Sequence, residues 1–371
     1  MKKIFHNKFL KVAWLLCAWL CTTSVWAQAD RMYASGALSL KPGGETETQY
    51  FAIHLENASM DYVAYQLDIY LPEGLELAYY DGEPDIYIED TSMYPTNRSK
   101  VPYHTLAIKV NDDFIRVICA DIDGNRKLLA SSGELFRVGV VPSSYLKPGD
   151  VKVALRNIVF SDINSEGPEF DSFDPTSIGT ASTTSTITLK VSATNKFSTC
   201  ILPFDAALPA GLEVYSCEAV DGDCLELTAQ SSFKAFTPYI VYASNGFDGT
   251  LSGEVDAAQY QEVVTNGYLT GTVVKQEITD EVRNYVLQNQ GEGPMFYRVG
   301  ETSFAVPAGK CWLTLPASLQ GVAALRLHRP TGIERIPVTT LHPTATYDLS
   351  GRRIAQPAKG VYIVGGKKVV K

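Results

Sequence analysis

The sequence has few histidines and cysteines, and none of them has the spacing of a metal site. Five histidines occur in 371 residues. The four beyond residue 29 lie far apart, without the i, i+2 or i, i+4 pairing of many metal ligands: His54, His104, His328 and His342. Five of the seven cysteines also follow residue 29, an odd number without a C-x-x-C pair. The sequence therefore predicts no metal ion and no redox dithiol.

A disulfide between Cys217 and Cys224 is the one pairing that local spacing allows. The two cysteines bracket Val220-Asp-Gly-Asp223, so they could face each other across a hairpin. Buried free thiols that behave as small apolar residues are the favoured interpretation.

The chain also lacks an excess of basic residues. Its 32 Lys and Arg face 41 Asp and Glu, a net charge of −9, and without the first 29 residues the charge becomes about −13, because four lysines are lost. Nucleic-acid phosphates require a basic surface, so the composition excludes nucleic acid as a partner. It also excludes electrostatic attraction to an anionic membrane.

Long apolar runs are missing apart from one near the N-terminus. The run Val12 to Ala27 is shorter than the roughly 20 residues of a membrane-spanning helix, so we expect no transmembrane segment. Four lysines precede it, and small residues around Ala27 and Ala29 offer cleavage sites, which is the pattern of a secretory signal peptide. We expect export, with the mature protein outside the cell, at the outer surface or in the periplasm.

Apolar and polar residues alternate with a period of two along most of the remaining chain. Leu67, Ile69 and Leu71, for example, alternate with Asp68 and Tyr70, as in a half-buried strand. Pro-Gly and Asp-Gly turns separate such segments, and no segment has a sustained apolar stripe of period 3.6. The sequence therefore predicts an all-β protein built from sandwiches or barrels.

Composition divides the chain into five parts. We expect a signal peptide over residues 1–29, a first β-sandwich over 30–192, a second β-rich domain over 193–328, a linker over 329–343 and a tail over 344–371. Recurring prolines favour an extended linker. Two apolar runs joined by Gly-Gly predict a β-hairpin in the tail.

The order of turns and strands in the first domain resembles that of a cohesin module. The landmarks are, in chain order, Lys41-Pro-Gly-Gly44, Gln66 to Leu75, Val117 to Ala120, Gly133 to Val138 and Val153 to Ile158. The resemblance implies a jelly-roll β-sandwich, a family shared with carbohydrate-binding modules, that binds a dockerin-type protein or a polysaccharide. It also implies a structural role for two residues, against a backbone carbonyl: Arg98 and His104.

The tail resembles the C-terminal sorting signal of type IX secretion substrates, through Tyr347 to Ile354 and Gly360 to Lys371. This resemblance implies attachment to the outer cell surface. The second domain resembles a β module that is common in surface proteins of bacteria with type IX secretion. No activity follows from that resemblance.

No group of residues predicts catalysis or a cofactor site. Ser144 and Lys147 fit an S-x-x-K pattern, but the motifs that accompany it in serine enzymes are missing. The segment Asp121 to Asn125 lacks the later acidic ligand of a calcium loop. Paired carboxylates for glycoside cleavage stay open as the enzymatic alternative.

One long connection with little strand pattern, Tyr79 to His104, is the candidate ligand-binding segment. Exposed tyrosine rings offer flat apolar faces to sugar rings or to side chains of a partner. The alternative is that these rings cover the open edge of the sandwich. The candidate binding residues are Tyr79, Tyr80, Tyr87, Tyr94 and Tyr103.

These observations predict a secreted or cell-surface, non-catalytic protein whose cohesin-like domain binds an extracellular protein or glycan. Two alternatives stay open: a structural or adhesive surface component without a discrete ligand site, and a polysaccharide-acting enzyme.

Overall fold

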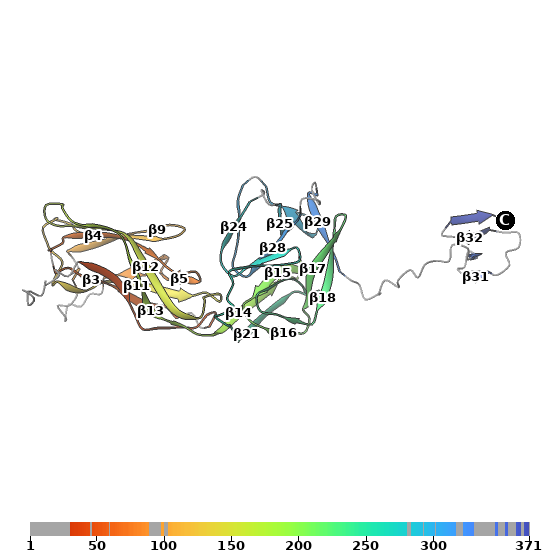
Figure 1. The fold of residues 1–371 in the computed structure, drawn as a ribbon, viewed down its shortest axis with the longest axis horizontal. Coiled ribbons are helices and arrows are strands. Elements are labelled where there is room, and N and C mark those ends of the chain that lie inside the picture. The colour runs from red at the N-terminus through yellow and green to blue at the C-terminus, as the bar shows by residue number, and fades with distance from the viewer. Residues whose placement is uncertain are drawn as a thin grey trace, which may run out of the picture.

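The computed structural model describes most of residues 30–329 in full, and the backbone of four short strands beyond residue 345. The fully described ranges are 30–44, 47–58, 60–88, 98–99, 103–279, 283–291, 293–300, 302–316 and 322–329. Two β-rich domains follow one another in this part of the chain (Figure 1), which confirms the all-β fold class. No helix in it is long and apolar enough to cross a membrane. The expected signal peptide and most of the expected linker lie outside the described residues.

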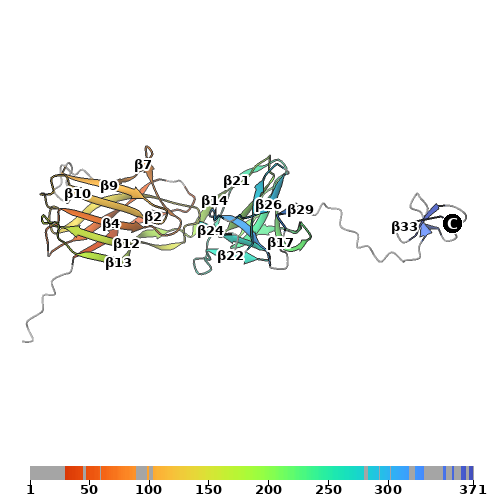
Figure 2. The same cartoon turned by 90° about the horizontal axis from the view of Figure 1, so that it is seen from above.

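The first domain is a sandwich of two sheets around one core. One sheet has the order β1–β3–β11–β5, with β8 also paired to β11. Its strands are β1 (Arg31–Ser35), β3 (Gln49–Glu56), β5 (Leu75–Leu77), β8 (Ile86–Tyr87) and β11 (Ser132–Pro142). The other sheet has the order β2–β13–β12–β4–β10–β9, and most of its strands are visible side by side in Figure 2. Its strands are β2 (Leu38–Leu40), β4 (Ala64–Tyr70), β9 (His104–Val110), β10 (Ile115–Asp121), β12 (Gly149–Ser161) and β13 (Glu169–Ala181).

The core of this sandwich follows from the alternation along the strands. Phe51, Ile53 and Leu55 on β3 are buried, and so are Val117 and Cys119 on β10. Burying an apolar side chain of this size contributes roughly 1.5–3 kcal/mol. The period-two prediction is therefore confirmed in both sheets.

The second domain is built on one sheet that curls until its two ends lie against each other. The order is β15–β20–β17–β18–β29–β26–β25–β28–β23–β22, antiparallel except for the parallel pair β18 and β29. The strands are β15 (Phe197–Leu202), β17 (Glu213–Asp221), β18 (Cys224–Gln230), β20 (Thr237–Tyr242), β22 (Val263–Asn266), β23 (Leu269–Thr272), β25 (Asn284–Asn289), β26 (Pro294–Arg298), β28 (Lys310–Thr314) and β29 (Ala324–His328). Two small pairs flank this sheet: β16 (Ala206–Ala207) with β19 (Ser232–Phe233), and β24 (Gln276–Ile278) with β27 (Phe304–Val306).

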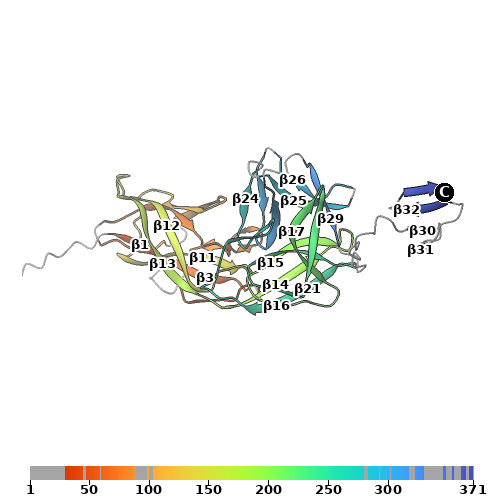
Figure 3. The same ribbon diagram turned by 45° about the vertical axis from the view of Figure 1, so that its right-hand side comes forward.

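The strand β14 (Thr184–Val191) shows where one core gives way to the next. It pairs along its whole length with β21 (Phe247–Glu254), and Figure 3 shows the two strands together in the second domain. Its inward side chains Ile187, Leu189 and Val191 belong to the second core. The expected boundary near residue 192 assigned this strand to the first domain. In the structure the change of core comes before β14, because its alternating apolar residues face the second domain.

The joint between the domains is closely packed around Tyr145. This residue lies on the turn between β11 and β12 of the first domain and packs against the second core. Its hydroxyl donates to the Ile201 carbonyl at 3.4 Å, and the Tyr260 hydroxyl donates to the Tyr145 carbonyl at 2.6 Å. Gly309 lies directly beside it, since a Cβ added there would lie 1.9 Å from the Tyr145 hydroxyl. Burial raises the pKa of Tyr145, as expected for a hydroxyl shielded from water.

The cysteines beyond residue 29 are free thiols, and all but Cys224 are buried. In the hairpin of β17 and β18, Cys224 faces Asp221, whereas Cys217 faces Leu227. The interpretation as buried free thiols, rather than a Cys217–Cys224 disulfide, is therefore confirmed.

Four short strands form a separate small sheet in the tail. They are β30 (Thr346–Tyr347), β31 (Arg353–Ile354), β32 (Val361–Val364) and β33 (Lys367–Val370), in the order β31–β30–β32–β33. Strands β32 and β33 pair antiparallel from Val364 and Lys367 outward, which confirms the predicted hairpin.

Candidate functional site

The tyrosines expected to bind a ligand lie in separate places. Tyr79 and Tyr80 form β6 (Tyr79–Tyr80), which pairs with β7 (Glu83–Pro84), and their side chains are 55% and 78% exposed. Tyr87, on β8, packs edge to face against Tyr50, with ring centroids 5.6 Å apart. The Tyr50 hydroxyl donates to Asp85 at 2.7 Å, and this bond raises the pKa of Tyr50 to about 12. Tyr87 is therefore partly engaged within the domain, while the β6–β7 hairpin is open to solvent.

Tyr103 lies at the opposite end of β9 from this hairpin. It immediately precedes β9, whereas Tyr79 lines a cleft together with Val110, the last residue of that strand. A seven-residue strand spans about 20 Å. The Arg126 guanidinium covers the ring of Tyr103 at 4.1 Å. Tyr94 lies outside the described residues, and the ligand-binding role of all five tyrosines stays a prediction.

The outer face of the first domain is the solvent side of β12, β4, β10 and β9. Directly paired residues on neighbouring strands point to the same side of a sheet, so outward residues form rows across the four strands. The central row of the outer face consists of Ala107, Ile118, Gln66 and Val159. Ile118 is 41% exposed. Most of its neighbours have small side chains, among them Ala107 in this row and Ala120 and Ala64 in the next row. An exposed apolar side chain thus lies in the middle of an uncharged row.

A charged row borders the central row on the same face. It consists of Lys109, Arg116, Asp68 and Arg156. The Asp68 carboxylate is fully buried and accepts bonds from Arg116 Nε and Nη2, each at 2.7 Å, and from Asn157 Nδ2 at 2.7 Å. Burial alone would raise the pKa of Asp68, but the bonds from Arg116 and Asn157 lower it overall. The carboxylate therefore stays ionised and fixes Arg116 in a bidentate geometry.

Two aromatic rings continue the charged row toward the second domain. Tyr70 stacks on Phe114 with ring centroids 5.6 Å apart. The Arg156 guanidinium lies 4.6 Å from the Tyr70 ring, and that of Arg116 lies 5.4 Å from the Phe114 ring. Tyr70 thus lies between a ring on the β10 side and a guanidinium on the β12 side, which holds these side chains in place.

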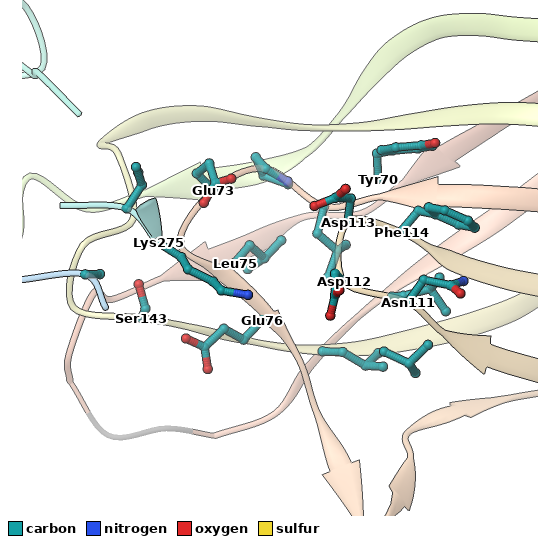
Figure 4. A pocket seen from close by; sticks show the side chains of 18 of the residues that line it. Tyr70, Glu73, Leu75, Glu76, Asn111, Asp112, Asp113, Phe114, Ser143 and Lys275 are labelled. Atoms are coloured by element: carbon teal, nitrogen blue, oxygen red, sulfur yellow. The ribbon is translucent and has the colours of Figure 1, made fainter. Parts of the chain in front are cut away.

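A cleft of about 770 Å³ lies where this end of the first domain meets the second domain (Figure 4). The first domain lines it with the turns around Glu73 and Asp112, and the second domain with the segments around Lys275 and Pro307. Its charged side chains are Glu73, Glu76, Asp112, Asp113 and Lys275. Figure 4 shows Lys275 pointing from the second-domain side toward the side that carries Glu76 and Asp112.

Arg98 has the structural role that the sequence resemblance implied. Its side chain is fully buried and donates to the carbonyls of Leu129 at 2.7 Å, Leu55 at 2.6 Å and Ala130 at 2.9 Å, and also to the side chain of Asn57. The predicted contact with backbone carbonyls is therefore confirmed for Arg98.

His104, the first residue of β9, is buried, and its protonation within the fold is unfavourable. Burial lowers the pKa of His104 below its ordinary 6.5, although Asp121 partly opposes this shift. Below about pH 6.5 the imidazole of His104 is protonated in the unfolded chain, whereas its lowered pKa disfavours protonation in the folded chain. The free energy of unfolding therefore falls as the pH drops.

We expect the free energy of unfolding to decrease between pH 7 and pH 5, and the substitution His104→Gln to flatten this decrease. Chemical denaturation across this range measures it, with His328→Gln on the exposed end of β29 as the control. An equally steep decrease in His104→Gln would show that other groups cause the acid sensitivity.

Comparison with known proteins finds likeness in structure alone. No family model and no curated protein matches this sequence. A non-cellulosomal cohesin from Archaeoglobus fulgidus matches with 16% identity and a TM-score of 0.26, over 41% of this chain and 86% of that chain. A cohesin module of a family 33 glycoside hydrolase from Clostridium perfringens matches with 10% identity and a TM-score of 0.31, over 41% and 96%. A type I cohesin–dockerin complex from Clostridium thermocellum matches with 13% identity and a TM-score of 0.29, over 41% and 88%. The solved structures that part of this chain resembles are thus cohesin modules, as the sequence landmarks predicted.

Proposed function

We propose that the first domain is a non-catalytic module that binds an extracellular protein partner through the outer face of β12, β4, β10 and β9. The observation that carries this proposal is the central row, where Ile118 is exposed among mostly small side chains on the outer face. A partner that covers this row removes apolar area from water. The sequence resemblance to cohesins implies a partner of the dockerin type.

The charged row supports the same proposal. Arg116 is held by Asp68 through two bonds of 2.7 Å before any partner arrives, so little side-chain entropy is lost on binding. Arginine and aromatic side chains are enriched where interfaces are strongest, and Arg116, Arg156 and Tyr70 lie together here. The face therefore combines an apolar centre with a rigid polar border.

Export by residues 1–29 and surface attachment through residues 344–371 belong to this proposal. They would place the outer face where an extracellular partner can reach it. A glycan is the second candidate ligand, because Tyr79 and Tyr80 expose their rings on the β6–β7 hairpin.

The substitution Ile118→Asp tests the outer face. A carboxylate in the centre of an apolar contact must lose its hydration on binding, so we expect the partner to bind at least ten-fold more weakly. The partner would be captured from culture medium with the immobilised mature protein, identified, purified, and titrated by calorimetry against both forms.

The matched control is Ile122→Asp, since Ile122 is 76% exposed in the loop after β10, outside the central row. Equal affinity of the partner for Ile118→Asp and the unchanged protein would overturn the proposed face. Loss of binding in a Tyr79→Ala/Tyr80→Ala variant, together with binding on a glycan array, would favour the glycan instead.

A further inference from the structure

We propose that the cleft between the two domains is a second binding site, which takes an extended cationic segment of a partner protein. The site does not include Ile118, although Tyr70 borders both the cleft and the outer face. Its volume of about 770 Å³ lies within the range of known ligand pockets, and junctions between domains are a common place for them. Tyr145 and Gly309 pack against each other at the joint between the two walls.

The charges that line the cleft define the occupant. The first domain contributes four carboxylates against the single ammonium group of Lys275: Glu73, Glu76, Asp112 and Asp113. Among the described residues, none of these five groups takes part in an ion pair. A concave surface that carries one sign of charge concentrates its field, so the cleft attracts cations.

The spacing of the carboxylates favours a chain of charges over a single ion. No group of three or more His, Cys, Asp or Glu side chains in the described residues lies close enough to hold a metal ion. Carboxylates that are too far apart for one ion match positive charges that are spaced along a peptide. The residues around them are largely apolar, including the exposed Val110, Ala305 and Pro307, and such residues suit the aliphatic stems of lysine and arginine.

Two of the three aromatic side chains that line the cleft are engaged within the first domain. Tyr70 is stacked between Phe114 and Arg156, and Arg116 lies against the ring of Phe114. Sugar rings stack on free aromatic faces, and among these three rings Tyr79, which is 55% exposed, has the free face. The cleft offers mainly carboxylates and aliphatic surface, which is the chemistry that a basic peptide requires.

The test uses the mature protein and a fluorescent eight-residue peptide of alternating lysine and valine, followed by anisotropy. We expect binding that weakens as salt is added. The variant Asp112→Asn/Asp113→Asn should bind at least ten-fold more weakly, and Lys275→Gln should bind several-fold more tightly because it removes the opposing charge. A gain of affinity cannot come from misfolding.

The control variant Asp171→Asn/Asp174→Asn removes the same charge from exposed positions of β13, outside the cleft lining. Equal binding by the two asparagine variants would overturn the proposal, and so would equal binding of a peptide with glutamate in place of lysine. Displacement of the peptide by neutral oligosaccharides would assign the cleft to a glycan. The Ile118→Asp variant should bind the peptide normally, so failure at the outer face is distinguishable from failure at the cleft.

Discussion

Replacing Arg98 by methionine is expected to lower the free energy of unfolding of the first domain by about 3–5 kcal/mol. The guanidinium donates to three backbone carbonyls and to Asn57, in a place that water does not reach. Methionine fills part of the volume but donates no hydrogen bond, so these acceptors lose their partners. For a domain of this size the loss corresponds to a fall in melting temperature of about 10 °C.

The position of Arg98 explains why one side chain has so large an effect. Leu55 and Asn57 lie at the end of β3, while Leu129 and Ala130 lie in the loop that leads into β11. Burial lowers the pKa of Arg98 to about 10, so the group is still charged at neutral pH. A buried charge satisfied by carbonyl oxygens thus ties this loop to the sheet.

Thermal and chemical denaturation of the two forms measures the effect. Arg126→Met is the matched control, because Arg126 lies in the same loop but its side chain is 45% exposed, where ion pairs contribute about 1 kcal/mol at most. Similar losses in both variants would contradict the structural role assigned to Arg98.

The fold was predictable because alternation acts locally along each strand. Phe51, Ile53 and Leu55 on β3 carry the signal at every second position, and the structure buries all three. The domain boundary was harder to predict, because apolar and polar residues would alternate along β14 in the same way whichever of the two cores the strand faced. Its pairing with β21, more than fifty residues away, decides that β14 joins the second core.

The candidate surfaces were less predictable for a related reason. Ile118 lies at an outward position of β10, between the inward residues Val117 and Cys119. An apolar residue at a position where the alternation predicts a polar one was the signal in the sequence for this surface. The rows of the outer face depend on pairing registers, which the sequence does not display. The sequence of the tyrosine segment does not reveal that β9 lies between Tyr79 and Tyr103 in space, and the binding role of its tyrosines stays a prediction.

Replacing Tyr145 by alanine is expected to uncouple the two domains, with a loss of about 2–4 kcal/mol from the interface. The ring packs against the second core, and the alanine side chain leaves that surface uncovered. In the unchanged protein we expect the domains to unfold together in calorimetry. In Tyr145→Ala we expect two separate transitions and a larger radius of gyration in solution scattering.

A second variant keeps the Tyr145 side chain but removes its ring from the contact between the domains. Gly309→Ala keeps Tyr145 but places a Cβ 1.9 Å from its hydroxyl, so the ring must leave its site. Gly211→Ala is the matched control, because Gly211 has a similar φ of +83° against +78° for Gly309, and no atom lies within 4 Å of the added Cβ. Both alanine substitutions carry the cost of a left-handed backbone, and only Gly309→Ala displaces Tyr145. Two transitions in Gly309→Ala and one in Gly211→Ala would establish Tyr145 as the residue that joins the domains. A single transition in all four proteins would show that the remaining contacts between the domains, including the bond from the Tyr260 hydroxyl to the carbonyl of residue 145, suffice without it.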